Sequence, residues 1–146
     1  MSRTEPILSW RSWRLRIDPE THVVQPVLES CVYGEPWPER QAFASYCPAH
    51  ALPEPDCGCG IYAVTTRRAA LEWARWAQSA LPNPIVLGRV QLWGRVLPHS
   101  AGYRAQLAYP YEVAVLADET LHVADARRLE RLLQAAYLVD IAETAA

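Results

Sequence analysis

A long proline-rich segment, residues 31–59, constrains the fold of this chain more than any other feature of the sequence. Proline lacks a backbone N–H and interrupts helices and strands, and five prolines fall in this segment: Pro36, Pro38, Pro48, Pro53 and Pro55. Regular spacing of apolar residues is lost here, and the only helix we expect is a short one over residues 38–46. Irregular segments of this length are uncommon in compact domains unless they are functional or tied down. We therefore expect a specific interaction to order the segment.

The same segment concentrates four side chains that can ligate a metal ion. They have the spacing C-x2-H-x6-C-x-C and are Cys47, His50, Cys57 and Cys59. Zinc prefers thiolate and imidazole ligands in a tetrahedron, and Gly58 and Gly60 let the backbone bend tightly around the second pair. We predict that these four residues bind Zn²⁺ on a loop of about residues 44–60, and that the metal orders this loop.

Other interpretations of the cluster remain open at this point. The thiols and the histidine can be unconnected side chains, or two of the thiols can form a disulfide, although a cytoplasmic protein keeps its thiols reduced. Cys57 and Cys59 can also form a redox pair or join an iron–sulfur cluster with Cys31 as its fourth cysteine. Sixteen positions separate Cys31 from Cys47, so we expect Cys31 outside the site. The H-E-x-x-H and zinc-deaminase patterns are absent, and the cluster supplies no obvious general base. These observations favour a structural metal over a catalytic one.

The rest of the chain predicts an α+β fold with a mostly antiparallel sheet, two main helices and the irregular Cys/His loop. Alternating apolar residues predict strands over residues 9–17, 23–28, 60–64, 85–97, 103–109 and 112–116, with Pro110 ending the fifth. One helix is expected from the N-cap Thr66 to residue 81, with Trp73 on its apolar stripe, and a second from the N-cap Asp125 to about residue 143. On the second helix Leu129, Leu133 and Tyr137 are expected to be buried, and Arg127, Arg128, Glu130 and Arg131 to face water.

Length and composition limit the organisation of the chain. It has 146 residues, of which 51% are hydrophobic, and no linker divides it, so we expect one domain over residues 1–146. The apolar runs are too short for a transmembrane helix, and the first residues lack a signal-peptide core, which favours a cytoplasmic protein. A net charge of −2 gives no general attraction to membranes or nucleic acid.

A second group of residues is a candidate for ligand binding: Arg14, Tyr62, Trp93 and Arg104. Trp93 falls near Arg89, Arg95 and Arg104 in an expected strand pair, and such a face can stack on a base or contact a phosphate. The alternative is that arginine stems or a helix simply cover Trp93.

Several short motifs resemble those of a family of small, uncharacterised bacterial proteins. The motifs are Trp13-Arg14, the Cys/His loop ending in Cys57-Gly-Cys59-Gly-Ile-Tyr-Ala63, Leu92-Trp93-Gly94, and Gly102-Tyr103-Arg104-Ala105 followed by Tyr109-Pro110. The match covers about residues 10–140, leaves Cys31 outside the shared pattern and brings no established activity. A weaker likeness to the ADP-ribosyltransferase fold rests on Gly60-Ile61-Tyr62, which leads into a helix, with Glu112 as the only obvious carboxylate near a later strand.

These observations lead to one expected function and two alternatives. We expect a non-enzymatic, zinc-stabilised module that binds a protein partner or acts as a regulator. The first alternative is an enzyme acting on a nucleotide-like ligand, with Arg14, Tyr62, Arg104 or Glu112 around a cleft. The second is nucleic-acid binding through the face of Arg89, Trp93, Arg95 and Arg104. The sequence leaves the oligomeric state open.

Overall fold

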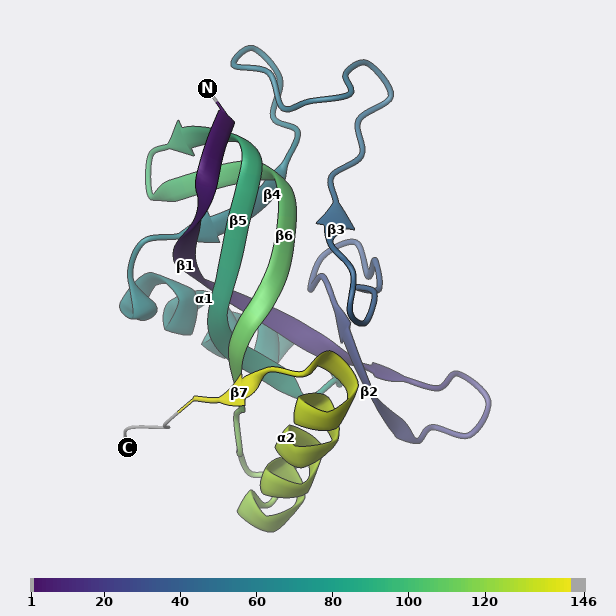
Figure 1. Ribbon diagram of the computed structural model, residues 1–146. Coiled ribbons are helices and arrows are strands. Elements are labelled where there is room, and N and C mark those ends of the chain that lie inside the picture. The colour runs from purple at the N-terminus through teal and green to yellow at the C-terminus, as the bar shows by residue number, and fades with distance from the viewer. Residues whose placement is uncertain (1, 143–146) are drawn as a thin grey trace.

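The computed structural model describes residues 2–142 and contains two helices and a seven-stranded, mostly antiparallel sheet (Figure 1). The α+β class predicted from the sequence is therefore confirmed. In chain order the elements are β1 (Ser2–Ile17), β2 (Val24–Glu29), β3 (Phe43–Ala44), β4 (Ile61–Val64), α1 (Arg67–Ala80), β5 (Ile85–His99), β6 (Gly102–Val115), α2 (Val123–Tyr137) and β7 (Asp140–Ile141).

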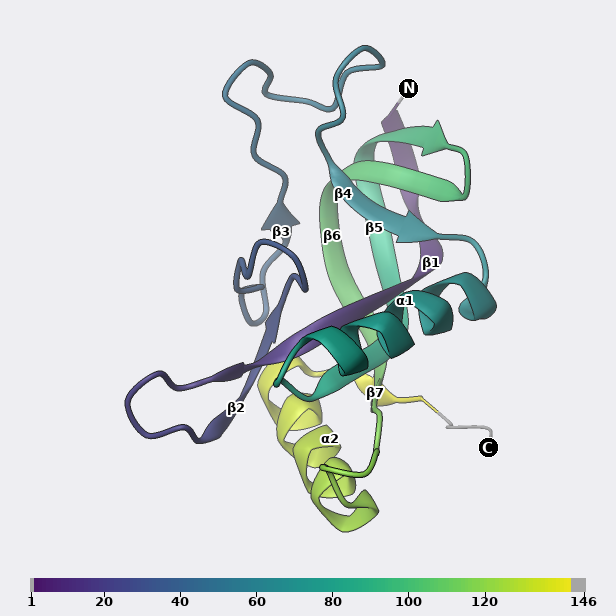
Figure 2. The same ribbon diagram turned by 180° about the vertical axis from the view of Figure 1, so that it is seen from behind.

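Four of the strands form a closed circuit, which Figure 2 shows from its β4 side. β5 pairs with both β1 and β6, β6 pairs with β4, and β4 returns to β1. The seam between β4 and β1 consists of a single residue pair, Trp10 with Val64, whereas the hairpin of β5 and β6 is paired along nearly its whole length. In the described structure the rest of β4 is therefore not paired with β1.

The core lies inside this curved sheet and extends to the first half of the proline-rich segment. Trp13 and Trp37 are fully buried and meet edge to face with ring centroids 5.5 Å apart, and Phe43 stacks on Trp37 at 4.6 Å. The backbone N–H of Trp37 also donates to the carbonyl of Leu28. Burial of large aromatic rings therefore orders residues 37–43 without a metal.

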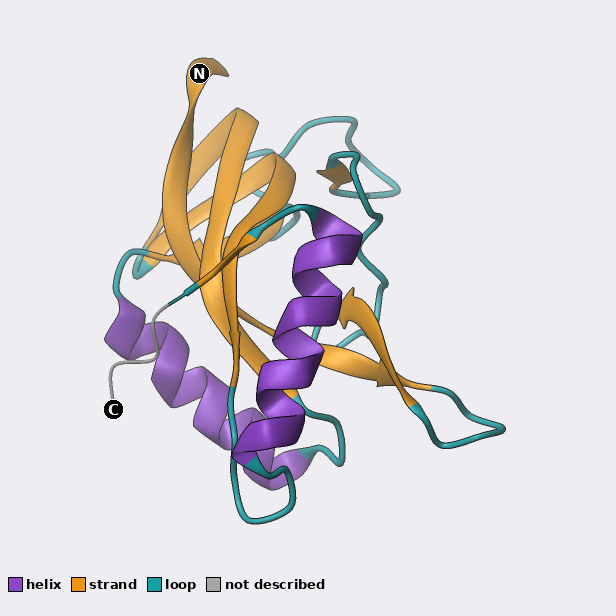
Figure 3. Cartoon of the chain, turned by 60° about the horizontal axis from the view of Figure 1, so that its bottom comes forward, coloured by secondary structure: helices purple, strands orange, loops and turns teal. Residues whose placement is uncertain are grey.

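The two helices pack in different places on the sheet (Figure 3). α1 begins at the N-cap Thr66, whose hydroxyl accepts a hydrogen bond from the Ala69 N–H, as predicted. It buries Ala74 and Ala77 against Ile85, whereas α2 packs Leu129 and Leu133 into the main core. Neither described helix is long and apolar enough to cross a membrane.

The expected helix over residues 38–46 is absent from the described structure. Its place is taken by β3, in which Phe43 pairs with Ala108 of β6. The stacking of Phe43 on Trp37 favours this extended backbone over a helix.

The prediction that Pro110 ends a strand is also wrong. β6 continues through Pro110 to Val115, because the register shifts between the pairs Arg89–Glu112 and Val90–Pro110. A bulge of this kind accommodates a residue that has no N–H to donate.

The predicted bounds and exposed face of the second helix need correction. His122, not Asp125, is the N-cap, and the helix ends at Tyr137, where Leu138 takes a left-handed conformation and the chain turns into β7. Glu130 was expected in water but is buried, because its carboxylate accepts from the Val115 N–H and pairs with Arg127. On α1, Trp73 was expected on the buried stripe but is about half exposed. The last part of the predicted helix, residue 143, lies outside the described residues.

Candidate metal centre

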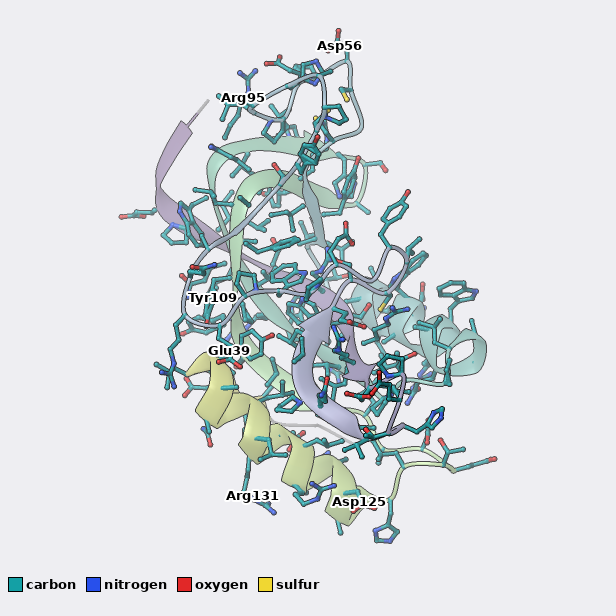
Figure 4. All side chains as sticks on the ribbon, turned by 90° about the vertical axis from the view of Figure 1, so that its right-hand side faces the viewer. Glu39, Asp56, Arg95, Tyr109, Asp125 and Arg131 are labelled. Atoms are coloured by element: carbon teal, nitrogen blue, oxygen red, sulfur yellow. The ribbon has the colours of Figure 1, made fainter. Side chains whose placement is uncertain are left out.

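The loop between β3 and β4 extends beyond the end of the sheet and brings the four predicted ligands together. One potential ligand atom from each of Cys47, His50, Cys57 and Cys59 lies within 4.8 Å of the others. Figure 4 shows sulfur atoms gathered at this end of the molecule, near the labelled Asp56. Cys31 is not in the group, because it packs with α1 and Ile85 in a separate apolar cluster.

Three of the six distances between these ligand atoms are close to the edges of a tetrahedron of ligands around a metal ion. A metal–sulfur bond of about 2.3 Å and a metal–nitrogen bond of about 2.0 Å give tetrahedral edges of roughly 3.8 Å between sulfurs and about 3.5 Å between sulfur and nitrogen. The Cys47 and Cys57 sulfurs are 3.9 Å apart, and the His50 Nδ1 lies 3.5 Å from the Cys47 sulfur and 3.8 Å from the Cys59 sulfur. The four residues are therefore close enough to hold a metal ion.

Backbone N–H groups around the cluster favour the thiolates that a metal requires. A hydrogen bond from the backbone of Ala49 lowers the pKa of Cys47, and one from the backbone of Glu54 lowers the pKa of Cys59 to about 7. The pKa of Cys57 is raised: the backbone of Cys59 acts to lower it, but the neighbouring thiols of Cys59 and Cys47 outweigh that effect.

The histidine responds to the same sulfurs. Hydrogen bonds to Cys59 and Cys47 raise the pKa of His50, because an imidazolium is stabilised beside thiolates. The cluster therefore favours a positive charge at its centre.

Arg104 of β6 attaches the loop to the sheet. Its guanidinium donates to the carbonyls of Cys59 at 2.7 Å and Glu54 at 2.6 Å, and the residue is only 7% exposed. A weaker ion pair joins Arg95 to the Glu54 carboxylate at 3.7 Å, and the Tyr62 hydroxyl donates to the Gly58 carbonyl. Arg104 therefore positions the loop of residues 45–60, which we call the metal loop. The sequence did not suggest this role.

Most of the other predicted ligand-binding residues are engaged within the fold. Arg14 pairs with Glu29 at 3.0 Å, and Glu112 pairs with Arg89. Trp93 pairs with Leu107 in the sheet.

Two arginines of the expected Arg/Trp face have partners within the fold: Arg89 pairs with Glu112, and Arg104 donates to the carbonyls of Cys59 and Glu54. Trp93 pairs with Leu107 and Arg104 with Leu97, and a register shift in β5 lies between these two pairs. Of the predicted group of Arg14, Tyr62, Trp93 and Arg104, only Tyr62 lines the cleft described next.

A cleft with a volume of about 870 Å³ opens beside the metal loop, at the short seam between β1 and β4. Its lining comes from β1, the start of the proline-rich segment, the metal loop, β4 and α1. Arg11 lies in this lining and was missed from the sequence. The sequence does contain one indication of its role. By alternation Arg11 shares the strand face of Trp13 and Leu15, and a charged residue is unexpected on this apolar face.

Comparison with known proteins found no matching family model, no matching curated protein and no matching solved structure. The resemblance to the bacterial family with the Cys/His loop therefore stays a prediction from its motifs.

Proposed function

We propose that this chain is a zinc-stabilised binding module without enzymatic activity, in which a structural zinc ion orders one wall of a ligand-binding cleft. The observation that carries the proposal is the convergence of Cys47, His50, Cys57 and Cys59 from one loop. Four protein ligands complete the sphere of a structural zinc site, whereas a catalytic zinc site keeps one position for water or substrate. The ion then contributes to folding and does not take part in a reaction.

Zinc is the proposed ion because three thiolates and one imidazole at these distances suit it better than magnesium or calcium, which prefer oxygen ligands. The four cysteines of the described chain are free. Three thiols this close together oxidise readily unless they bind a metal and stay in a reducing compartment. We therefore place the protein in the cytoplasm, where thiols are kept reduced.

A binding role is supported by the aromatic rings around the cleft. Tyr33 is 85% exposed and Tyr46 is 81% exposed, and Trp73 adds a third exposed ring. Tyr46 directly precedes the ligand Cys47, so the metal also fixes the position of this ring. Clustered exposed aromatic residues are typical of recognition surfaces.

The two alternative functions receive less support. An enzyme built on Arg14, Tyr62, Arg104 and Glu112 needs these side chains around one cleft, and the cleft is lined by Tyr62 alone among them. Nucleic-acid binding through a shared Arg/Trp face needs free arginines, whereas Arg89 and Arg104 are held by contacts within the fold.

Metal analysis of the purified full-length chain tests the proposal. We expect one zinc per chain, and we expect Cys57→Ser to lower zinc affinity at least tenfold and to lower the melting temperature, because a hydroxyl is a poor zinc ligand. Cys31→Ser is the matched control, since it also removes a thiol but leaves the cluster intact, and zinc content should not change. A wild-type chain that melts unchanged after verified removal of the metal would contradict the structural role.

A further inference from the structure

We propose that the cleft beside the metal loop binds a small organic anion with a flat apolar body, and that Arg11 contacts its anionic group. The inference rests on the proposed binding function and deepens it by naming the class of ligand. It depends on three features of the cleft: its size, the unpaired cation in its lining and the exposed rings at its rim.

The size of the cleft suits a small molecule. Its volume of about 870 Å³ lies within the range of about 300–1,000 Å³ that is usual for small-molecule sites. It lies where the sheet circuit is closed by only one residue pair, so strand pairing does not fill the space between β1 and β4. One wall is the metal loop itself, through Gly58, Cys59 and Gly60.

Arg11 is the cation of the cleft, and the surrounding structure holds it in place. Its guanidinium lies over the Trp37 ring, 5.0 Å from the centroid, and donates to the Tyr62 carbonyl and the Ser30 hydroxyl. Burial lowers its pKa to about 10, so it stays charged at neutral pH.

Arg11 nevertheless retains unused hydrogen-bonding capacity. Within residues 2–142 its guanidinium forms no ion pair, and its buried Nε has no acceptor. A guanidinium has more N–H groups than the two engaged here. The remaining Nη1 and Nη2 N–H groups would donate to an anionic group in the cleft.

The rim of the cleft is formed by aromatic rings from three separate segments. Tyr33 and Tyr46 come from the proline-rich segment, Tyr62 from β4 and Trp73 from α1. Exposed rings of this kind gain stability when a flat apolar body covers them. Glu35 also lines the cleft and interacts electrostatically with Arg11. Because Glu35 is exposed to solvent, its repulsion of a bound anion is weak.

Two fluorescent probes that differ only in charge test the proposal. 8-Anilinonaphthalene-1-sulfonate is a flat aromatic anion, and N-phenyl-1-naphthylamine is the same body without the sulfonate. Titration into the zinc-loaded full chain should give an affinity for the anion at least about tenfold higher than for the neutral probe, as a charge-assisted hydrogen bond implies. Equal affinities would overturn the anion site and leave a merely apolar groove, such as one that takes a peptide.

Substitutions then locate the probe. Arg11→Met should lower anion affinity about tenfold and leave the neutral probe unchanged, and Arg11→Lys, which keeps the charge but loses the planar fork, should fall between. Trp73→Ala should weaken both probes about threefold to tenfold. Tyr111→Ala is the control, because Tyr111 is also an exposed aromatic residue, at 37%, yet it does not line the cleft.

The outcomes separate this inference from the proposed function. If the chain holds zinc but Tyr111→Ala weakens binding as much as Trp73→Ala, or Arg11→Met affects both probes alike, the anion site is refuted and the zinc proposal stands. If Arg11→Met does not fold, Arg11→Lys carries the same test. If the purified chain holds no zinc, the proposed function fails, whichever probe binds.

Discussion

Replacing Arg104 by methionine should weaken the attachment of the metal loop to the sheet. The guanidinium makes two hydrogen bonds to loop carbonyls, at 2.7 and 2.6 Å, and it is almost buried. Hydrogen bonds from a charged donor each contribute about 1.5–3 kcal/mol, and methionine restores part of the lost apolar packing. We therefore expect Arg104→Met to lower the free energy of unfolding by about 2–4 kcal/mol.

Urea unfolding of the zinc-loaded protein measures this change, and hydrogen exchange locates it. Exchange should accelerate at residues 54–60. It should remain unchanged in the part of the β5–β6 hairpin that lies far from the loop. Arg95→Met is the matched control: its ion pair with Glu54 spans 3.7 Å and is partly exposed, so its loss should cost less than about 1 kcal/mol. Equal effects of the two substitutions, or a wild-type exchange pattern in Arg104→Met, would refute the positioning role.

Three further substitutions test other parts of the structure. Gly60→Ala should lower stability by about 1–3 kcal/mol in thermal unfolding, because Gly60 has a φ of +121° that an L side chain rarely adopts. Backbone hydrogen bonds, first that of Thr21, lower the pKa of Asp18 below 3.8, so its stabilising contribution is present above pH 3.8 and lost as the pH falls through the lower folded-state pKa. The stability difference between wild type and Asp18→Asn should therefore shrink in acid, and a difference that is constant with pH would contradict this linkage. Tyr137→Phe should cost about 1–3 kcal/mol in urea unfolding, because the buried hydroxyl donates to the Trp37 carbonyl; an unchanged midpoint would show that this bond contributes nothing.

The parts of the fold that local patterns determine were predictable from the sequence. Alternation of apolar residues located the β5 strand, and the Thr66 N-cap located the start of α1. The errors arose where a distant partner decides the local structure. Pro110 stays inside a strand because a bulge forms opposite β5, and α2 stops at Tyr137, whose hydroxyl is bound to Trp37, 100 positions away.

The candidate site divides in the same way. The four ligands lie within thirteen residues, so their spacing was sufficient to group them. The roles of Arg104 and Arg11 depend on partners 45 to 51 positions away, which no local pattern reports. For Arg11 a charged residue on the apolar face of a strand was the only available indication.

X-ray absorption spectroscopy at the zinc edge of the purified full-length chain tests the central claim most directly. The four converging side chains predict one zinc per chain, with three sulfur ligands at about 2.3 Å and one nitrogen ligand at about 2.0 Å. In Cys57→Ser the sulfur count should fall, whereas in Cys31→Ser it should stay at three. A first shell dominated by oxygen, a sulfur count that responds to Cys31, or a chain without stoichiometric zinc would contradict the assignment.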